Sequence, residues 1–244
     1  MRPRVGLIGC GRFGALAARY IAPLADLVVC DPRVKSAVPP RARRGTLAEA
    51  ASQNLVVLAV PISAMRGVLR EIAPHVRPGA VVADVCSVKT LPLAWMRAAL
   101  PRSVAILGTH PLFGPDSDTG SLRGQRIVAC PSRGARRLIP ALRRLARARG
   151  MRLVVMTPSA HDRLMAETLL VTHYVGRLLH GAGLRRRSPS TAAYRHLEVV
   201  METALRDSEQ LFLDMWRFNP GAARVRRALE ASAPTIAGRA GGRD

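Results

Sequence analysis

The first two-thirds of the chain alternates short apolar runs with segments whose apolar residues recur at helical spacing. Short, continuous apolar runs are typical of strands that are buried on both faces. The predicted strands are residues 5–8, 27–30, 55–60, 80–85, 104–107, 125–130 and 152–156. The predicted helices are residues 12–21, 47–51 behind a Thr46 cap, 64–72 behind a Ser63 cap, 93–100 and 136–149. This alternation predicts a parallel sheet with helices on both faces, which is a doubly wound α/β domain.

The pattern changes after Pro158, where long helical segments replace the strands. Residues 160–184 read as one helix that is apolar on nearly all faces, residues 191–216 as a second, and residues 222–231 as a short third. A helix that is apolar on most faces must be buried. We therefore expect a smaller all-α domain over residues 158–244, whose helices are buried against the first domain or a partner chain, and a homodimer built through these helices is the favoured hypothesis.

A glycine motif, Gly9-Cys10-Gly11-Arg12-Phe13-Gly14, lies between the first predicted strand and the first predicted helix. Such glycines allow a tight turn and the close approach of a pyrophosphate, whose charge then lies at the helix N-terminus. Asp31, at the end of the second strand, is placed to bond the ribose hydroxyls and to repel a 2′-phosphate. This favours NAD over NADP, although Arg33 and Lys35 could weaken the preference. An ordinary glycine turn is the alternative.

Residues 1–157 are therefore expected to form a Rossmann-type dinucleotide-binding domain. The residues expected to contact the cofactor are Gly9, Gly11, Arg12, Phe13, Gly14, Asp31, Val60 and Pro61.

Two further motifs follow later strands, at the edge where open α/β sheets bind ligands. The first is Asp84-Val85-Cys86-Ser87-Val88-Lys89, in which Ser87 alone would more often be a helix cap than a catalytic group. The second runs from Gly108 to Asp116 and holds His110 in a loop with two prolines. A lone histidine is usually structural, but one in this position is a candidate general base because it can be neutral near pH 7.

The sequence Gly-x-His-Pro-Leu-Phe-Gly-Pro-Asp, preceded by Asp-x-x-Ser-Val-Lys, resembles the prephenate and arogenate dehydrogenases of tyrosine biosynthesis. The resemblance covers roughly residues 4–214. It continues with Ala160-His161-Asp162, Thr172-His173 and Tyr194-Arg195. The glycine motif is generic to dinucleotide enzymes, whereas the histidine motif is specific to this family.

The resemblance implies roles for individual residues. His110 would take the proton of the substrate's ring hydroxyl as hydride leaves for the nicotinamide, and Ser87 would hold His110. Arg195 would grip a substrate carboxylate with its two-pronged guanidinium, a solvated helix arginine being the alternative. Lys89 would steer the anionic substrate or cofactor. The residues expected to bind substrate are Arg195, Lys89, His173 and Tyr194, although His161 and His173 could equally be packing histidines.

The formal net charge of +22 raises the possibility of a nucleic-acid partner. Only Lys35 and Lys89 are lysines, however, so the positive charge is arginine spread along the whole chain, and aromatic residues make up 4%. With no nucleic-acid-binding motif, no such partner is expected. A diffuse positive field would still help to capture an anionic substrate.

The remaining composition argues for a cytoplasmic protein. No run of about 18 apolar residues indicates a membrane span, and the N-terminus reads as the first strand and helix, not as a signal peptide. The four cysteines, Cys10, Cys30, Cys86 and Cys130, lack the spacing of a metal site or a redox pair. No appended mutase or ligand-sensing segment is recognisable, so regulation through a separate domain is not expected.

The sequence leaves the substrate open. The resemblance implies NAD-dependent oxidative decarboxylation of prephenate to 4-hydroxyphenylpyruvate, with arogenate and 4-amino-4-deoxyprephenate as alternatives. From other classes, the chain could be a different small Rossmann dehydrogenase or a nucleotide-binding module without catalysis. Reduction of NAD separates these, because a binding module would show cofactor affinity without turnover.

Overall fold

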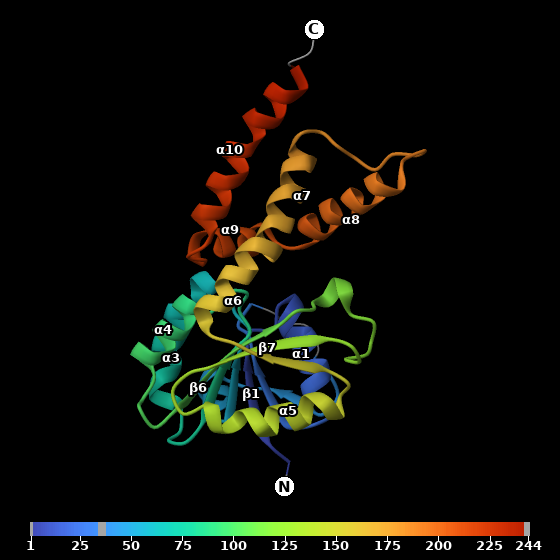
Figure 1. Ribbon diagram of the computed structural model, residues 1–244. Coiled ribbons are helices and arrows are strands. Elements are labelled where there is room, and N and C mark those ends of the chain that lie inside the picture. Colours follow the sequence, from blue (N-terminus) through green and yellow to red (C-terminus); the bar gives the residue numbers. More distant parts are fainter. Residues whose placement is uncertain (1, 34–37, 242–244) are drawn as a thin grey trace. The chain divides into compact units, whose positions relative to one another are not determined.

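Eight strands form one sheet, in the order β3-β2-β1-β4-β5-β6-β7-β8, in the computed structural model, which describes residues 2–33 and 38–241 (Figure 1). The strands are β1 (Arg4–Ile8), β2 (Asp26–Cys30), β3 (Ala42–Arg44), β4 (Leu55–Leu58), β5 (Val81–Asp84), β6 (Ala105–Pro111), β7 (Arg126–Pro131) and β8 (Arg152–Val155). The winding direction reverses between β1 and β4, which are paired in parallel. Ligands of such sheets bind in the crevice outside the carboxyl ends of the strands at this switch point.

The sheet is mostly parallel, as predicted, but β7 runs antiparallel to β6. The segment between these strands contains one short 3₁₀ turn, η3 (Pro115–Ser117), and no helix to carry the chain back along the sheet. The chain therefore returns directly beside β6. Strand β3 was not predicted, because its three residues, Ala-Arg-Arg, are largely polar and lie at the edge of the sheet.

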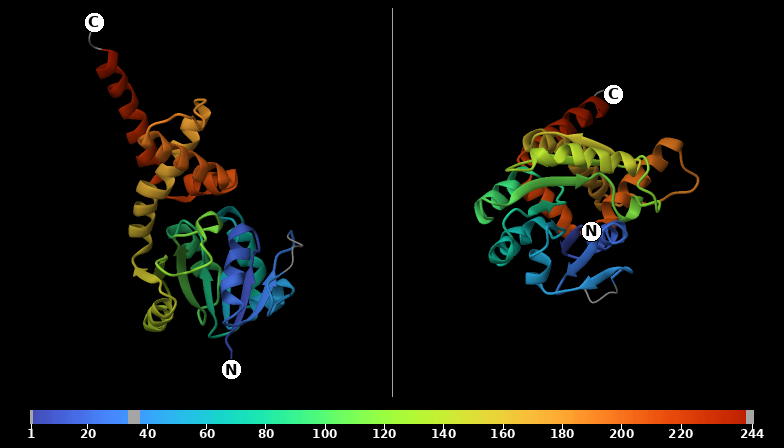
Figure 2. Two further views of the ribbon diagram at one scale, coloured as in Figure 1. Left: turned by 90° about the vertical axis from the view of Figure 1, so that its right-hand side faces the viewer. Right: turned by 90° about the horizontal axis from the view of Figure 1, so that it is seen from below.

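Helices cover both faces of the sheet, as Figure 2 shows for α5 on one side and α3 and α4 on the other. The helices that cover the two faces are α1 (Arg12–Ile21), α2 (Leu47–Ala51), α3 (Met65–Ile72), α4 (Thr90–Ala99) and α5 (Ile139–Ala148). Short 3₁₀ turns add η1 (Ile62–Ala64), η2 (Ala73–His75) and η4 (Arg136–Leu138). Two apolar clusters fill one face, around Leu7 and Val29 beneath α1 and around Leu107 and Ala129 beneath α5.

The two predicted helix caps differ in outcome. The Thr46 cap is confirmed, because Glu49 N donates to Thr46 Oγ1 (3.2 Å) and Thr46 N donates to Glu49 Oε2 (2.7 Å). The Ser63 cap is wrong. A 3₁₀ turn begins at Ile62, directly after Pro61, so Ser63 lies inside η1 and α3 begins only at Met65.

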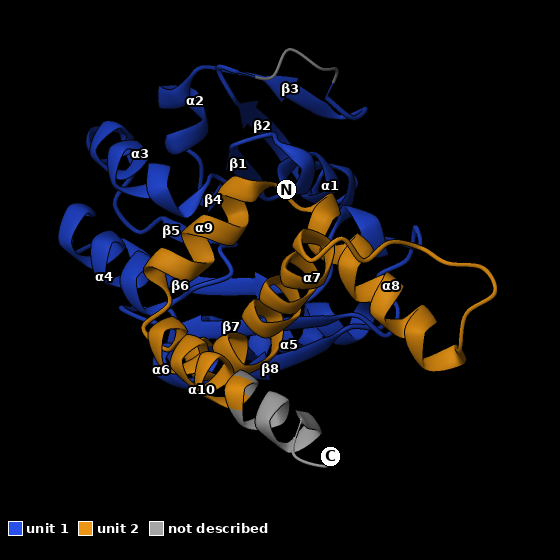
Figure 3. Ribbon diagram, turned by 90° about the horizontal axis from the view of Figure 1, so that it is seen from above, with its two compact units in different colours: residues 1–161 blue, residues 162–244 orange. Residues whose placement is uncertain are grey.

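The chain divides into two compact units, residues 1–161 and 162–244, here called the sheet unit and the helical unit (Figure 3). The sequence placed this boundary between residues 157 and 158, where α6 begins. The helices after the sheet are α6 (Pro158–Met165), the π-helical segment η5 (Ala166–Leu170), α7 (Val171–Gly181), α8 (Ala192–Arg206), α9 (Glu209–Phe218) and α10 (Ala222–Gly241).

The helical unit differs from the prediction in two elements. The helix predicted over 191–216 is two helices, because the chain breaks at Asp207 and Ser208 caps α9 by accepting from Leu211 N (3.2 Å). Helix α10 continues past the predicted end at residue 231. Helices α7 and α8 pack closely at Gly176, where a Cβ would lie 2.6 Å from the Ala204 Cβ. Among the described residues, no helix has the length and apolar character to cross a bilayer.

Candidate active site

The glycine motif forms a tight turn between β1 and α1. Gly9 has a φ of +96°, and a Cβ there would lie 2.3 Å from the Ala59 carbonyl oxygen, so only glycine fits. A Cβ at Gly14 would lie 2.2 Å from the Gly9 carbonyl oxygen, which lets α1 approach the turn. At Gly11, in contrast, a Cβ would meet nothing within 4 Å. The turn is therefore closely packed at Gly9 and Gly14 and open at Gly11.

Gly11 is the N-cap of α1, and no side chain of the described residues caps this helix end. The start of the helix thus combines the absence of a side-chain cap with an N-cap residue that has no Cβ and has room around it. This arrangement suits a pyrophosphate, since a helix N-terminus supplies both donors and a favourable dipole. Val60, which follows β4, lies against the same turn, with its Cγ1 3.0 Å from a Cβ built on Gly9. The residues present fit a dinucleotide.

Asp31 binds the turn itself. Its Oδ2 accepts a hydrogen bond from Cys10 N (2.6 Å), and its Oδ1 accepts one from Arg33 N (2.9 Å). The carboxylate therefore holds the glycine turn in place, in addition to any contact with a ribose. A carboxylate has about four acceptor positions, so both tasks are compatible. Lys35, which the sequence suggested as a modulator of cofactor preference, lies outside the described residues.

The other predicted cofactor contacts surround this turn. Phe13 is half-buried in the first turn of α1, and Pro61 is exposed after β4. Arg12 projects from the start of α1 and binds Asp116 in the loop after β6, with Nη2 2.7 and 2.8 Å from the two carboxylate oxygens. This pair was not predicted, because neither motif indicates a contact between residues that are so far apart in the sequence.

His110 lies within β6, whereas the sequence placed it in the following loop, and it is buried. Its Nδ1 lies 2.9 Å from Nε2 of His161, and the two rings meet edge to face with centroids 5.1 Å apart. Its Nε2 has no hydrogen-bond partner among the described residues. Burial lowers the pKa of His110 well below 6.5, with smaller contributions from His161 and Lys89. His110 is therefore neutral at pH 7 and has one ring nitrogen available to accept a proton.

Lys89 has no exposed surface and forms a buried ion pair with Asp84. Its Nζ also donates to the Thr109 carbonyl oxygen (2.8 Å), and Thr109 Oγ1 donates to the Asp84 carbonyl oxygen (2.5 Å). The residue directly before His110 is thus fixed to the end of β5 from two sides. Asp84 and Thr109 were recognised in the sequence only as members of their motifs, and this network was not predicted.

Ser87 is buried, and its hydroxyl has no hydrogen-bond partner in the described part of the chain. The expected bond from Ser87 to His110 is absent there, and the contact that the structure shows for His110 is the one from its Nδ1 to His161. Ser87 does not cap a helix either, since Lys89 holds the N-cap position of α4. A buried hydroxyl without a partner is costly unless a ligand completes it.

The remaining predicted residues lie in the helical unit, and the structure does not bring them together: Tyr194 and Arg195 lie at the start of α8, whereas His173 on α7 lies beside Asp207, at the other end of α8. Tyr194 OH donates to the Arg185 carbonyl oxygen (2.7 Å), and the exposed Arg195 donates through Nη1 to the Ser190 carbonyl oxygen (3.1 Å). His173 is buried, with Nε2 3.4 Å from Asp207 Oδ2. Burial lowers the pKa of His173, and Asp207 opposes this shift.

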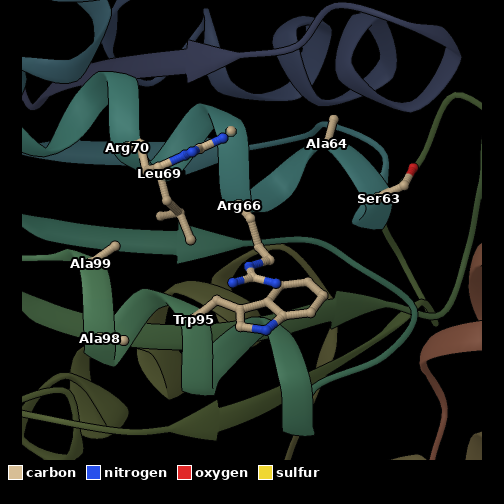
Figure 4. Close-up of a pocket in the computed structure, with 9 residues that line it drawn as sticks. Ser63, Ala64, Arg66, Leu69, Arg70, Trp95, Ala98 and Ala99 are labelled. Atoms are coloured by element: carbon tan, nitrogen blue, oxygen red, sulfur yellow. The ribbon is translucent and has the colours of Figure 1, made fainter.

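A hollow of about 700 Å³ lies elsewhere on the sheet unit, between α3 and α4 (Figure 4). Arg66 lies over the Trp95 ring there, 6.0 Å from its centroid. None of the predicted site residues lines this hollow. Across residues 2–33 and 38–241, no three His, Cys, Asp or Glu side chains gather in a way that could hold a metal ion. All four cysteines are buried, and none forms a disulfide.

Comparisons with known proteins agree with this geometry. The family described as "Prephenate dehydrogenase, nucleotide-binding domain" matches residues 38–163. The chain is 30% identical over 177 residues to a probable arogenate/prephenate dehydrogenase of Methanocaldococcus jannaschii, covering 68% of this chain and 39% of that protein. It is 31% identical over 191 residues to a 4-amino-4-deoxyprephenate dehydrogenase of Streptomyces pristinaespiralis, covering 75% of this chain and 62% of that protein.

Solved structures share the fold. A prephenate dehydrogenase from A. aeolicus, in complex with hydroxyphenyl propionate and NAD+, matches with a TM-score of 0.74 at 16% identity, over 96% of this chain and 89% of that one. Synechocystis arogenate dehydrogenase matches with a TM-score of 0.65 at 20% identity, over 98% and 93%. The chain spans only 39% and 62% of the two curated relatives named above. Since the family match covers more than half of its residues, the chain belongs to the prephenate dehydrogenase family, a family of oxidoreductases.

Proposed function

We propose that this protein is an NAD-dependent dehydrogenase that converts prephenate to 4-hydroxyphenylpyruvate and carbon dioxide in tyrosine biosynthesis. The observation that carries the proposal is the state of His110, a buried imidazole that is neutral at pH 7 and has its Nε2 available. His110, near the end of β6, and Ser87, after the neighbouring strand β5, lie at the carboxyl edge of the sheet that also bears the glycine turn. A base and a dinucleotide cradle on one sheet edge suit a dehydrogenase.

The cofactor assignment rests on the turn after β1. The open space at Gly11 and the uncapped start of α1 suit a pyrophosphate, and Asp31 suits a ribose without a 2′-phosphate. When bound, NAD accepts the hydride. The A. aeolicus enzyme, which shares this fold, binds NAD+.

The chain's own residues would then perform three tasks. His110 Nε2 accepts the proton of the ring hydroxyl as hydride leaves the ring carbon that bears this hydroxyl. The Ser87 hydroxyl forms a hydrogen bond with the same substrate oxygen. Loss of carbon dioxide from the quaternary ring carbon makes the ring aromatic, and His110 returns the proton to the ring oxygen. Because aromatisation drives the reaction, the protein mainly supplies orientation and a base.

Substrate recognition falls to the helical unit in this proposal. Arg195 would bind a carboxylate, with Tyr194 beside it at the start of α8. His173 lies near the other end of α8, so the described contacts do not support a joint role with these two residues. Lys89 has a different role from the one that the sequence suggested. Since it is fully buried against Asp84 and Thr109, it would hold the strand end that carries His110 and would not touch the substrate.

A homodimer through the C-terminal helices is part of the proposal. Several large apolar side chains of the helical unit are exposed, and Leu178 and Val199 are 56% and 60% exposed. Apolar surface of this kind on α7, α8 and α9 is typical of an interface. Light scattering of the purified protein tests this, and a monomer at micromolar concentration would contradict it. Four cysteines without a disulfide suit a reducing compartment such as the cytosol.

The test of the reaction is the initial rate of NADH formation with prephenate, arogenate and 4-amino-4-deoxyprephenate offered in parallel, with NAD and then with NADP. Turnover of prephenate with NAD supports the proposal. The amino analogue is the second candidate, because a dehydrogenase named for it covers 75% of this chain at 31% identity. NAD binding without turnover of any of the three would identify a nucleotide-binding module instead.

A further inference from the structure

The contact between His110 and His161 does more than pack two rings. Both side chains are buried, at 8% and 0% exposure, and the Nδ1 to Nε2 distance of 2.9 Å is that of a hydrogen bond. Sequence motifs left His161 as either a packing residue or a site residue. The geometry decides between these, because a ring that only packs need not aim a nitrogen at its neighbour.

The position of His161 is set by the start of α6. Ala160 N donates to Thr157 Oγ1 (3.2 Å), and His161 N donates to the Thr157 carbonyl oxygen (3.0 Å). Pro158 is the first residue of α6, where its fixed φ suits a helix start. The cap therefore holds His161 in the first turn of a helix that begins three residues after β8, the strand next to β7.

A hydrogen bond between two imidazoles requires one N–H and one lone pair. His110 can act as a base at Nε2 only if that nitrogen carries a lone pair, which places the proton of its neutral ring on Nδ1. The Nδ1–H then donates to His161, whose Nε2 accepts. The opposite arrangement would place the proton of His110 on Nε2 and make it a donor toward the substrate, unable to take the hydroxyl proton.

We propose that His161 is the positioning residue of His110: its Nε2 accepts the Nδ1–H of His110 and so fixes the tautomer that leaves Nε2 of His110 open to the substrate hydroxyl. The inference rests on the proposed role of His110 as general base. It assigns to an imidazole the task that a carboxylate performs in many catalytic pairs.

An imidazole differs from a carboxylate in one respect that suits this site. A carboxylate brings a negative charge, which stabilises the imidazolium and raises the pKa of the base. An imidazole brings no negative charge, so it orients the ring without holding the proton there. This agrees with the low pKa of His110 and with a base that must return its proton within one turnover.

The test uses three variants of the full-length protein. His161→Phe keeps a ring of similar shape but removes the acceptor. His161→Gln retains an acceptor oxygen at similar reach. His75→Phe is the matched control, because His75 is exposed on η2, outside the site. We expect kcat to fall by about 10–100-fold in His161→Phe, with NAD affinity unchanged. His161→Gln should recover most of kcat, and His75→Phe should match the native enzyme.

The tautomer itself is measured by heteronuclear NMR of the imidazole nitrogens, with the His110 signals assigned by their loss in His110→Asn. The native protein should show His110 protonated at Nδ1 and unprotonated at Nε2, and His161→Phe should show a mixture of both forms. A native His110 protonated at Nε2, or native kcat in His161→Phe, would overturn the inference. If His161→Phe fails to fold, His161→Asn, which is too short to reach, takes its place. The NMR result needs no turnover, so it remains decisive if every substrate fails.

Discussion

Arg12, at the start of α1, and Asp116, in the loop after β6, form an ion pair in which Nη2 of Arg12 lies 2.7 and 2.8 Å from the two carboxylate oxygens. Asp118 strengthens the same attachment by accepting from Tyr20 OH and from Arg19. The loop that follows the candidate base is thereby tied to the helix whose N-terminus would receive the cofactor. If Arg12 contacts the cofactor, as proposed, we expect cofactor binding and the conformation of this loop to be linked.

Replacing Asp116 with Ala should release Arg12 for the pyrophosphate. We expect the Kd of NAD to fall a few-fold, because Arg12 no longer has to leave a carboxylate partner. Both side chains are partly exposed, at 50% and 34%, so the free energy of unfolding should change by less than about 1 kcal/mol. Isothermal titration calorimetry measures the Kd of NAD, and urea denaturation measures the free energy of unfolding. Glu202→Ala, which removes an exposed pair with Arg206 on α8, is the control. Weaker NAD binding would show that the pair organises the site instead.

His110→Asn should lower kcat by about 10²–10⁴-fold while NAD binding stays native, since the change removes the base and leaves the glycine turn intact. Steady-state rates with prephenate measure the first effect, and calorimetric titration with NAD measures the second. Unchanged turnover would remove His110 from the mechanism. Loss of NAD binding would point to misfolding of β6, which a thermal melt of the same variant would reveal.

The pH dependence of kcat/KM follows from the pKa of His110. Burial, and then His161 and Lys89, lower this pKa well below 6.5. The base is active when neutral, so protonation at a lowered pKa means that activity persists as the pH falls through 6.5. Activity should decline only in more acidic solution. A pH–rate profile measured under constant ionic strength checks this, and an acid limb at or above 6.5 would contradict it.

Much of this fold was predictable because local sequence and tertiary structure agree. The apolar run over β1, the glycine turn and the periodicity of α1 all indicate the same element boundaries. The two largest differences have non-local causes. The direction of β7 depends on where the chain returns after Pro111, and the break between α8 and α9 depends on Ser208, a cap that an amphipathic pattern conceals.

The candidate site likewise contains residues that the sequence predicted and residues that it did not. His110, Ser87 and the glycines could be predicted because each occupies a motif position at or just after the end of a strand. The partner of His110 was not, because His161 belongs to a helix that starts far along the chain. The ion pair between Lys89 and Asp84 lies within one short motif, yet the pattern of residue types does not show that the lysine turns inward.

Asp31→Ser should raise the use of NADP relative to NAD, because it removes the charge that repels a 2′-phosphate. The structure adds a second expectation. Asp31 also accepts from Cys10 N, so its loss should loosen the glycine turn and lower kcat/KM with NAD. Rates with both cofactors measure the ratio and the absolute loss together. Unchanged preference would exclude Asp31 from ribose recognition, and Asp26→Ser, at the exposed start of β2, is the control.

Lys89→Met should destabilise the protein by about 3–5 kcal/mol, because it leaves the Asp84 carboxylate buried without its counter-charge. Both side chains have 0% exposure, so water cannot compensate. Urea denaturation measures the loss. The double variant Asp84→Leu, Lys89→Met should recover part of it, since it removes the uncompensated charge but leaves Cys86 N and the Thr109 carbonyl oxygen without these partners. That recovery separates the pair's effect on stability from its effect on activity. If the double variant is stable but turns over slowly, the pair positions Thr109 and His110. If it is both stable and fully active, the ion pair has no role in catalysis.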